Sequence, residues 1–237
     1  MLKPNVIHFD EIDSTSAYLK READNLTNFT IVETDFQSAG KGRKNRKWYS
    51  PKGENAMFSI LIKDIDIINR FPLLSLLSCL IVRNYIASLG VNNVQVKWPN
   101  DVYINGHKTC GILLEGRLPD YVVIGIGINL NQIEFSDEYR IAPTSVAKEL
   151  GHKLEKQAFL EGLCEYLLNS LEQFKNNLYD VINEFNNFNY LKDKEVTFID
   201  HDNELKGTVI GINDGGLLKV KVENTIYEIY SGEVVVK

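Results

Sequence analysis

The most informative stretch of the sequence is Gln37-Ser38-Ala39-Gly40-Lys41-Gly42-Arg43-Lys44-Asn45-Arg46-Lys47-Trp48. It gathers two glycines, two arginines, three lysines and a tryptophan in a chain whose net charge is -6. Glycines let backbone N–H groups approach a ligand, arginines grip phosphate oxygens with two N–H groups at once, and tryptophan offers a flat face to a ring. The stretch therefore predicts a phosphate or nucleotide site, with a solvated basic loop or a nucleic-acid patch as alternatives.

This stretch follows neither of the common phosphate-binding patterns. The P-loop requires G-x-x-x-x-G-K-[ST], which the stretch lacks. The dinucleotide pattern G-x-G-x-x-G fails because position 45 is Asn. The sequence thus indicates a nucleotide site of a less common kind.

A second stretch, Val96-Lys97-Trp98-Pro99-Asn100-Asp101-Val102, puts a lysine at the end of a short β run, before a proline and an Asn-Asp turn. An exposed lysine before a hairpin turn is the simplest interpretation. Its apolar neighbours Val96 and Trp98 favour a half-buried strand instead. Burying an ammonium group costs free energy unless the group meets an anion, so Lys97 is expected to face an anionic ligand.

Five motifs, in this order along the chain, resemble those of the biotin protein ligases in their short form without a DNA-binding domain. They are Asp13-Ser14-Thr15-Ser16, the stretch 37–48, the stretch 97–102, Cys110-Gly111-Ile112-Leu113-Leu114-Glu115 and Ile124-Gly125-Ile126-Gly127-Ile128-Asn129-Leu130. The resemblance covers essentially the whole chain, and the set is far more specific than any one motif. The chain departs from the family at Lys41, where Arg is usual, at Asn45, where Gly is usual, and at Ser16, where Asn is frequent. Lys41 keeps the charge of arginine but loses its planar fork.

The expected fold class is α+β. The resemblance implies a mixed or antiparallel sheet covered by helices, as in the catalytic domain of class II synthetases, followed by a small SH3-like β-barrel. We place the catalytic domain that binds biotin and ATP at residues 1–190 and the SH3-like domain at residues 191–237. Apolar patterns predict catalytic-domain strands at 6–9, 29–36, 55–62, 94–98, 102–104, 109–115 and 121–130. Helices are predicted at 14–24, 71–89, 144–150, 160–174 and 179–188, and C-terminal strands at 196–199, 207–212, 217–222, 226–230 and 234–236.

Composition excludes several classes of protein. Apolar residues make up 44% of the 237 residues, enough for a core, and the pI of about 5.3 argues against general affinity for nucleic acid. Three cysteines, Cys79, Cys110 and Cys164, and four histidines lack metal-binding spacing, so a transition-metal site is not expected. Scattered thiols and the absence of a signal-peptide pattern predict a cytoplasmic protein. The longest uncharged apolar run, 71–82, is 12 residues, too short for a bilayer, which needs roughly 20.

The resemblance assigns roles to named residues. The expected catalytic residues are Lys97, which would neutralise a carboxylate and a phosphate together, and Arg43. The expected biotin contacts are Ser14, Thr15, Ser16, Gln37, Gly40, Lys41, Gly42, Lys97 and Gly111. The expected contacts to ATP and the adenylate are Arg43, Arg46, Trp48, Asn100, Gly127 and Asn129. Asp101 is a weak candidate for a Mg²⁺ ligand.

Several of these residues also have a purely structural interpretation. Ser14 and Thr15 suit the start of a helix. Trp48 suits a core position that opens the next strand, and Asn129 suits a turn. The alternating glycines of the strand 121–130 leave one face bare, either for a packed helix or for a ligand.

The resemblance implies a reaction in two steps. ATP activates biotin to biotinyl-5′-adenylate, and a lysine of a biotin carboxyl carrier protein, from acetyl-CoA or pyruvate carboxylase, then takes biotin and releases AMP. Biotin and ATP are the expected small substrates, and Mg²⁺ is the expected metal ion. Neither DNA nor a membrane is an expected partner, and either a monomer or a homodimer is compatible with the sequence.

Three other functions compete with this one. A lipoate or octanoate ligase or transferase of the related fold would share the pocket lysine. A biotin-responsive repressor would need a helix-turn-helix, for which the residues before Ser14 are too few. A non-catalytic protein that binds biotin or its adenylate would bind without turnover.

Overall fold

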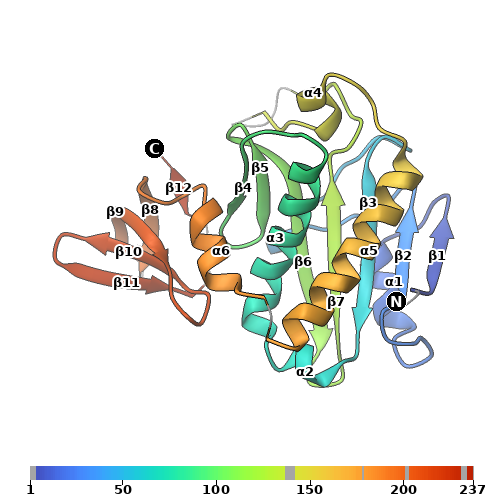
Figure 1. Cartoon of the computed structure of the whole chain (residues 1–237), viewed down its shortest axis with the longest axis horizontal. Coiled ribbons are helices and arrows are strands. Elements are labelled where there is room, and N and C mark those ends of the chain that lie inside the picture. The colour runs from blue at the N-terminus through green and yellow to red at the C-terminus, as the bar shows by residue number, and fades with distance from the viewer. Residues whose placement is uncertain (1–3, 137–141, 178, 201–202, 231–233, 237) are drawn as a thin grey trace.

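The computed structural model describes residues 4–136, 142–177, 179–200, 203–230 and 234–236. Its larger part is a seven-stranded sheet with helices on both faces, and its smaller part is a five-stranded sheet near the C-terminus (Figure 1). The larger sheet has the order β1-β2-β3-β7-β6-β5-β4. Its strands are β1 (Val6–Phe9), β2 (Ile31–Thr34), β3 (Ala56–Ile62), β7 (Tyr121–Ile128), β6 (His107–Arg117), β5 (Asp101–Ile104) and β4 (Val94–Lys97).

Strand direction in this sheet follows from the connections. Among the described strands of the sheet, β1 and β2 form the one parallel pair, because the helix α1 (Thr15–Arg21) lies between them in the chain. Every other neighbouring pair is antiparallel. The turn Asn105-Gly106 joins β5 to β6 with positive φ at both residues, 51° and 82°, which confirms the hairpin predicted from that dipeptide.

Two long helices cover one face of the sheet, α3 (Phe71–Ser88) and α5 (Lys156–Lys175) (Figure 1). Pro72 lies in the first turn of α3, where its missing N–H costs no hydrogen bond. The core is built from these helices and from alternate strand residues such as Phe58, Ile112, Ile124 and Ile126. By length and composition α3 would pass for a membrane span, but half of it is buried inside the protein.

The opposite face of the sheet is covered only in part. Leu19 of the helix α1 and Ala23, just after the helix, pack there against Val32, Leu61 and Val123. Since α1 is short and lies near β2 and β3, the part of this face toward β6, β5 and β4 is left for the loops. The candidate site lies on this second face.

The remaining elements are short. They are the 3-10 turn η1 (Arg43–Asn45) and the helices α2 (Ile65–Ile68), α4 (Val146–Leu150) and α6 (Val181–Phe188). The helix α2 has only four residues, and the sequence did not predict it because it spans a single turn.

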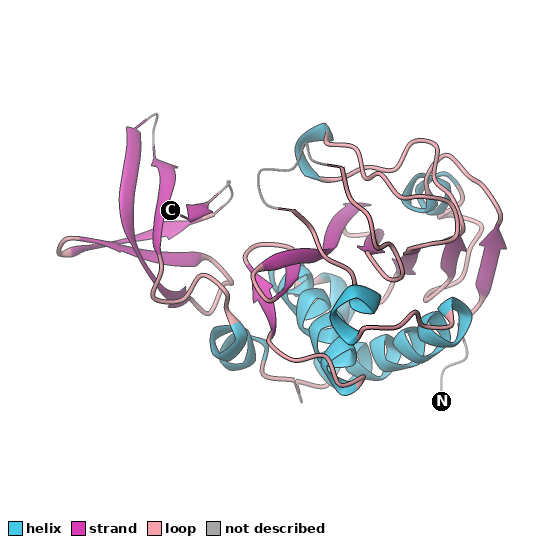
Figure 2. Ribbon diagram, turned by 90° about the horizontal axis from the view of Figure 1, so that it is seen from above, coloured by secondary structure: helices cyan, strands magenta, loops and turns pink. Residues whose placement is uncertain are grey.

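The C-terminal sheet is antiparallel throughout, in the order β11-β10-β9-β8-β12. Its strands are β8 (Glu195–Asp200), β9 (Asn203–Ile212), β10 (Leu218–Val222), β11 (Thr225–Ile229) and β12 (Val235–Val236). Together the two sheets confirm the predicted α+β fold with a small C-terminal β module. Figure 2 shows this module beside the main sheet, with α6 next to it.

One hydrogen bond joins the C-terminal module to a motif of the main sheet. The indole Nε1 of buried Trp98 donates to the carbonyl oxygen of Gly216 over 3.0 Å. Gly216 lies in the turn between β9 and β10, and it also approaches Leu73 and Leu76 of α3. The module is therefore anchored next to the residue that follows Lys97.

Candidate active site

Strand alternation gathers the site residues on the second face. Gly125 and Gly127 of β7 alternate with core isoleucines, so they face away from α3 and α5. In the register of the sheet, Gly125 pairs with Ser59 of β3 and Gly127 pairs with Gly111 of β6. The centre of this face therefore lacks bulky side chains. We call this surface, formed by Gly111, Gly125 and Gly127, the glycine floor.

A cluster of hydroxyl groups lies at one end of the floor. Thr15 Oγ1 and Ser16 Oγ each share a hydrogen bond with Ser59 Oγ, at 2.7 and 2.9 Å. Gln37 Oε1 accepts hydrogen bonds from the Thr15 backbone N–H at 2.9 Å and from its hydroxyl at 3.3 Å. A methyl group on Gly125 would lie 2.5 Å from Ser16 Oγ, so only glycine fits below this cluster.

Ser14 stands at the start of α1, as its capping interpretation predicted. Its Oγ accepts a hydrogen bond from the Ala17 N–H at 3.3 Å. Its own N–H donates to the Asp13 carboxylate, whose pKa is lowered mainly by the hydrogen bond from Arg21. Capping thus fixes the helix whose first residues carry the hydroxyl cluster.

Trp48 covers the middle of the floor. A methyl group on Gly127 would lie 2.6 Å from Trp48 Cε2, and one on Gly111 would lie 3.1 Å from Trp48 Cζ3. The indole therefore rests on these two glycines rather than in the core. Its Nε1 is buried and has no hydrogen-bond partner among the described residues. A buried donor without a partner is costly, so an acceptor on a ligand would stabilise it.

Residues 37–48, which we call the basic loop, fold back on themselves before Trp48. The Trp48 N–H donates to the Gly40 carbonyl at 3.0 Å, and the Gly42 N–H donates to the Arg46 carbonyl at 2.7 Å. Lys41 pairs with Lys47 across this small loop. The lysines of the loop and Arg46 are exposed. The loop thus presents several positive charges to solvent above the floor.

Arg43 connects the basic loop to the stretch that contains Lys97. Its guanidinium donates to Asn100 Oδ1 at 3.1 Å, and Asn100 Nδ2 donates to the Ile112 carbonyl at 2.6 Å. Asn100 is thereby held between the loop and β6. Two predicted site residues from distant parts of the chain meet here, Arg43 and Asn100.

Lys97 is half-buried at the end of β4, as its neighbours predicted. Val94 and Val96 face the core, so Lys97 projects to the face that carries the glycine floor. Its Nζ donates to the hydroxyl of Tyr103 at 3.1 Å and lies 5.0 Å from the centre of that ring. Tyr103 positions the ammonium group, and sequence analysis missed it.

Asp101, the weak candidate for a Mg²⁺ ligand, lies beside a lysine in this structure. Its carboxylate forms an ion pair with Lys108, Nζ to Oδ1 at 2.6 Å. Lys108 Nζ would also lie 3.3 Å from a methyl group on Gly111, so this lysine borders the floor. Sequence analysis missed Lys108 and Ser59. Strand alternation could have placed Ser59 on this face, whereas Lys108 reaches it through the irregularity in the pairing of β5 with β6, which the sequence does not reveal.

Asn129 lies at the end of β7 and is buried. Its Nδ2 donates to the Thr144 carbonyl at 3.1 Å, and its backbone carbonyl accepts from Val146 N–H at 3.0 Å. These bonds hold the segment that enters α4. They match the structural interpretation of Asn129 and leave its side-chain oxygen for other contacts.

The thiols lie in the core and not at the floor. Cys79, Cys110 and Cys164 are free and buried. Burial raises the pKa of Cys164 to about 12 and that of Cys110 still further, so both thiols are protonated at neutral pH. Neither is a nucleophile for covalent catalysis.

We expect Ser59→Ala to weaken binding of the ligand that occupies the hydroxyl cluster. The change removes the hydrogen-bond partner of both Thr15 and Ser16, so their hydroxyls lose their fixed directions. We expect about a tenfold rise in the dissociation constant of that ligand, equivalent to about 1.4 kcal/mol. Calorimetric titration would measure it, with Ser78→Ala as the control, since Ser78 is a buried serine of α3 bonded to the Leu74 carbonyl. If Ser59→Ala and Ser78→Ala bound this ligand with equal affinity, Ser59 would not contribute to the binding site.

Two family models match the chain. Residues 8–129 match the biotin/lipoate A/B protein ligase family, and residues 193–237 match the biotin protein ligase C terminal domain. The first match contains the hydroxyl cluster, the basic loop, the Lys97 stretch and the glycine floor. The second match contains all five strands of the C-terminal sheet.

Named relatives and solved structures agree with these models. A bifunctional ligase/repressor BirA of Bacillus spizizenii is 30% identical over 244 residues, covering 97% of this chain and 73% of that protein. A biotin--[acetyl-CoA-carboxylase] ligase of Paracoccus denitrificans is 31% identical over 161 residues, covering 64% of this chain and 67% of that protein. The structure of the Aquifex aeolicus biotin protein ligase in complex with biotin and ATP superposes with a TM-score of 0.85 at 28% identity and covers 98% of both chains.

Proposed function

Because the chain belongs to the biotin/lipoate A/B protein ligase family, we propose that it is a biotin protein ligase. It activates biotin with ATP and transfers it to a lysine of a carrier protein. The observation that carries this proposal is the common location of three features on one sheet face: the hydroxyl cluster, the glycine floor and Lys97.

Biotin is proposed to lie with its ring system at the hydroxyl cluster and its carboxylate toward Lys97. The ureido group of biotin has one carbonyl and two N–H groups, which need donors and acceptors together. Thr15, Ser16 and Gln37 supply both kinds of group. The carboxylate tail then extends along the floor toward the half-buried ammonium group.

In the first step a carboxylate oxygen of biotin attacks the α-phosphorus of ATP. A new P–O bond forms, the bond to the leaving pyrophosphate breaks, and biotinyl-5′-adenylate remains. Both reactants are anions, so a cation between them lowers the barrier. Lys97 is proposed to fill this position, while Arg43 and Arg46 hold phosphate oxygens.

In the second step the amine of the acceptor lysine attacks the carbonyl carbon of the anhydride. The C–O bond to AMP breaks, the amine loses a proton, and an amide forms. Lys97 is proposed to stabilise the oxyanion of the tetrahedral intermediate. AMP departs as a good leaving group, so this step needs less assistance from the protein.

The adenine is proposed to bind near the glycine floor beside Trp48. The indole N–H, which has no partner among the described residues, and the flat ring support this position. Asn129 is proposed to contact the adenosine through its side-chain oxygen. Mg²⁺ is proposed to arrive with the ATP phosphates, as part of the substrate, because the Asp101 carboxylate is engaged by Lys108.

We expect biotin plus ATP to protect the basic loop from trypsin. Four of the five basic residues of residues 41–47 are exposed, namely Lys41, Lys44, Arg46 and Lys47, and each is a cleavage site. Phosphates that bind Arg43 and Arg46 would fix the loop over the floor. Mass spectrometry of the fragments would measure cleavage, with cleavage after Lys192, an exposed lysine in the turn before β8, as the internal control. Equal cleavage of the loop with and without ligands would contradict closure.

The remaining assignments follow from the same proposal. The carrier is a biotin carboxyl carrier domain of a carboxylase, and the three free thiols accord with the cytoplasm. Residues 1–190 are proposed to form the catalytic unit and residues 191–237 the accessory module. The chain is proposed to act without DNA or membrane, as a monomer or a homodimer.

The test of the function is exchange of labelled pyrophosphate into ATP. The proposal expects exchange that requires biotin and does not occur with lipoate or octanoate. Exchange that occurs with lipoate or octanoate would mean that the substrate of the chain is that acid and not biotin. Tight biotin binding without exchange would make the chain a binding protein.

A further inference from the structure

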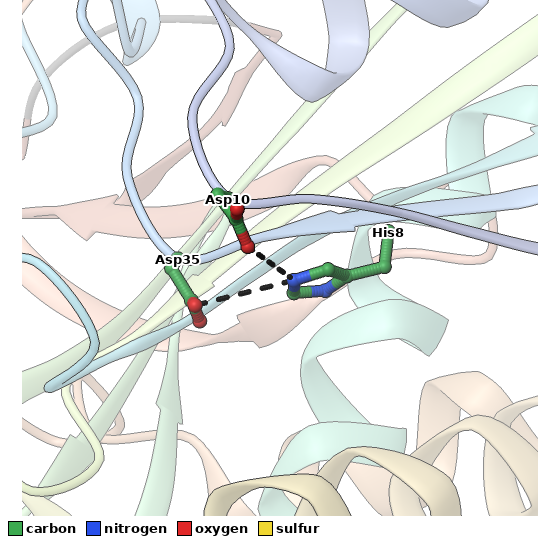
Figure 3. Close-up of side chains that lie close together, drawn as sticks. All are labelled: His8, Asp10 and Asp35. Atoms are coloured by element: carbon green, nitrogen blue, oxygen red, sulfur yellow. Dashed lines mark ion pairs between the residues drawn. The ribbon is translucent and has the colours of Figure 1, made fainter.

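A second cluster of polar side chains lies outside the candidate active site, where the parallel strands β1 and β2 end. His8 belongs to β1, Asp10 follows that strand, and Asp35 follows β2. The ligand atoms of these three side chains all lie within 4.8 Å of one another. Figure 3 shows the imidazole edge of His8 turned toward both carboxylates.

The distances in this cluster match those between ligands of one small ion. His8 Nε2 lies 3.6 Å from Asp10 Oδ1 and 4.0 Å from Asp35 Oδ2. Ligands that bind a tetrahedral zinc ion at about 2.0–2.2 Å lie roughly 3.4 Å apart. The two distances from His8 would have to shorten by up to about half an ångström, and the distance between the two carboxylate oxygens, which is at most 4.8 Å, by up to about 1.4 Å. The side chain of Asp10 is exposed and can make this movement.

A buried carboxylate fixes the orientation of His8. Glu33 is only 4% exposed, and its Oε1 lies 3.3 Å from His8 Nδ1, on the side of the ring opposite the aspartates. Metal-binding histidines almost always donate their second ring N–H to a carboxylate or carbonyl in this way. Glu33 thereby favours the tautomer with a proton on Nδ1 and a lone pair on Nε2.

The charge of the cluster also favours a cation. Glu33, Asp10 and Asp35 carry three negative charges, and Lys156 supplies one positive charge through its 2.6 Å ion pair with Asp35 Oδ1. The second oxygen of Asp35 is the one that faces His8.

We propose that His8, Asp10 and Asp35 bind one divalent transition-metal ion such as Zn²⁺, with Glu33 positioning the histidine. One imidazole and two carboxylates suit zinc and its neighbours, because imidazole is a poor ligand for Mg²⁺. The spacing of cysteines and histidines predicted no such site, since its ligands come from two separate strands and include a single histidine.

The position of this site gives the ion a structural role. The residues after Asp10 enter the hydroxyl cluster at 14–16, and the residues after Asp35 enter the basic loop at 37–48. An ion bound by residues at the ends of both strands would hold these two segments close together. It lies apart from the reacting groups and takes no part in the proposed chemistry.

The experiment is a zinc titration of the untagged chain, with thermal unfolding and the visible absorption of Co²⁺ as readouts. We expect one ion per chain, a higher Tm with Zn²⁺, and no change with Mg²⁺ at the same concentration. His8→Gln should lower the zinc affinity at least tenfold. Glu33→Gln should lower it by about 10- to 100-fold, as for other residues that orient a metal ligand.

Two further variants complete the test. His152→Gln changes an exposed histidine elsewhere and should bind zinc like the wild type. Asp10→Asn changes an exposed side chain and should weaken zinc binding without affecting the fold, so it decides the question if His8→Gln unfolds. Zinc binding that is equal in wild type, His8→Gln and Asp10→Asn would mean an adventitious ion only and would overturn the proposal. Equal shifts with Mg²⁺ and Zn²⁺ would also overturn it.

Discussion

Lys97→Ala is expected to lower biotin-dependent pyrophosphate exchange on the order of 100- to 1,000-fold. Lys97 is half-buried, faces the glycine floor and is held by the Tyr103 hydroxyl at 3.1 Å. Its charge is most valuable when the carboxylate and the α-phosphate meet, and less valuable when biotin alone is bound. We therefore expect kcat to fall more than biotin affinity. Initial exchange rates and calorimetric biotin binding would separate the two effects.

Two variants serve as controls for this prediction: one keeps the positive charge at residue 97, and the other removes a lysine at a distant position. Lys97→Arg keeps the charge but changes its shape, so it should retain part of the activity. Lys219→Ala removes a half-buried strand lysine from the C-terminal sheet and should leave exchange unchanged. Full exchange in Lys97→Ala would show that another group joins the two anions, and Lys108 at the edge of the floor would be the next candidate.

Gly127→Ala is expected to raise the KM for ATP by roughly 5- to 150-fold. The new methyl group would lie 2.6 Å from Trp48 Cε2 and 2.9 Å from Cζ2, closer than any stable contact. Either the indole or the adenine must leave the floor, and overpacking of this kind typically costs about 1–3 kcal/mol. Biotin is proposed to bind at the hydroxyl cluster beyond Gly125, so its KM should change little.

Gly111→Ala provides the matched control, because it adds the same group to the paired residue of the neighbouring strand. There the nearest indole atom would be 3.1 Å away and the next contact is the flexible end of Lys108. The effect on ATP should therefore be smaller than for Gly127→Ala. Steady-state kinetics with each substrate varied in turn would measure both. If Gly127→Ala raised the KM for biotin more than the KM for ATP, the proposed placement of the adenine would be contradicted.

The sequence predicted the elements of the fold well, because most of them carry strong local signals. Alternation revealed the strands, and the leucine spacing of 160–174 revealed α5. The pair Asn105-Gly106 located the turn from β5 to β6. The order of the strands and the parallel pairing of β1 with β2 came only with the structure, since both depend on contacts between distant residues.

The site was predicted through its motifs and not through its contacts. Gln37 and Thr15 were expected to act together, and the structure brings them into hydrogen-bond contact. Ser59, Tyr103 and Lys108 were missed because a serine, a tyrosine or a lysine in a strand carries no local sign of function. Their importance comes from the register, which brings them next to residues of other strands.

The bond between Trp98 and Gly216 has a consequence for synthesis of the chain. Its two partners are 118 residues apart in the chain. On the ribosome, the strand with Lys97 therefore emerges long before the carbonyl that completes its surroundings. A nascent chain can form the larger sheet and its helices first, but the indole of Trp98 gains this hydrogen bond only after the turn between β9 and β10 has been made.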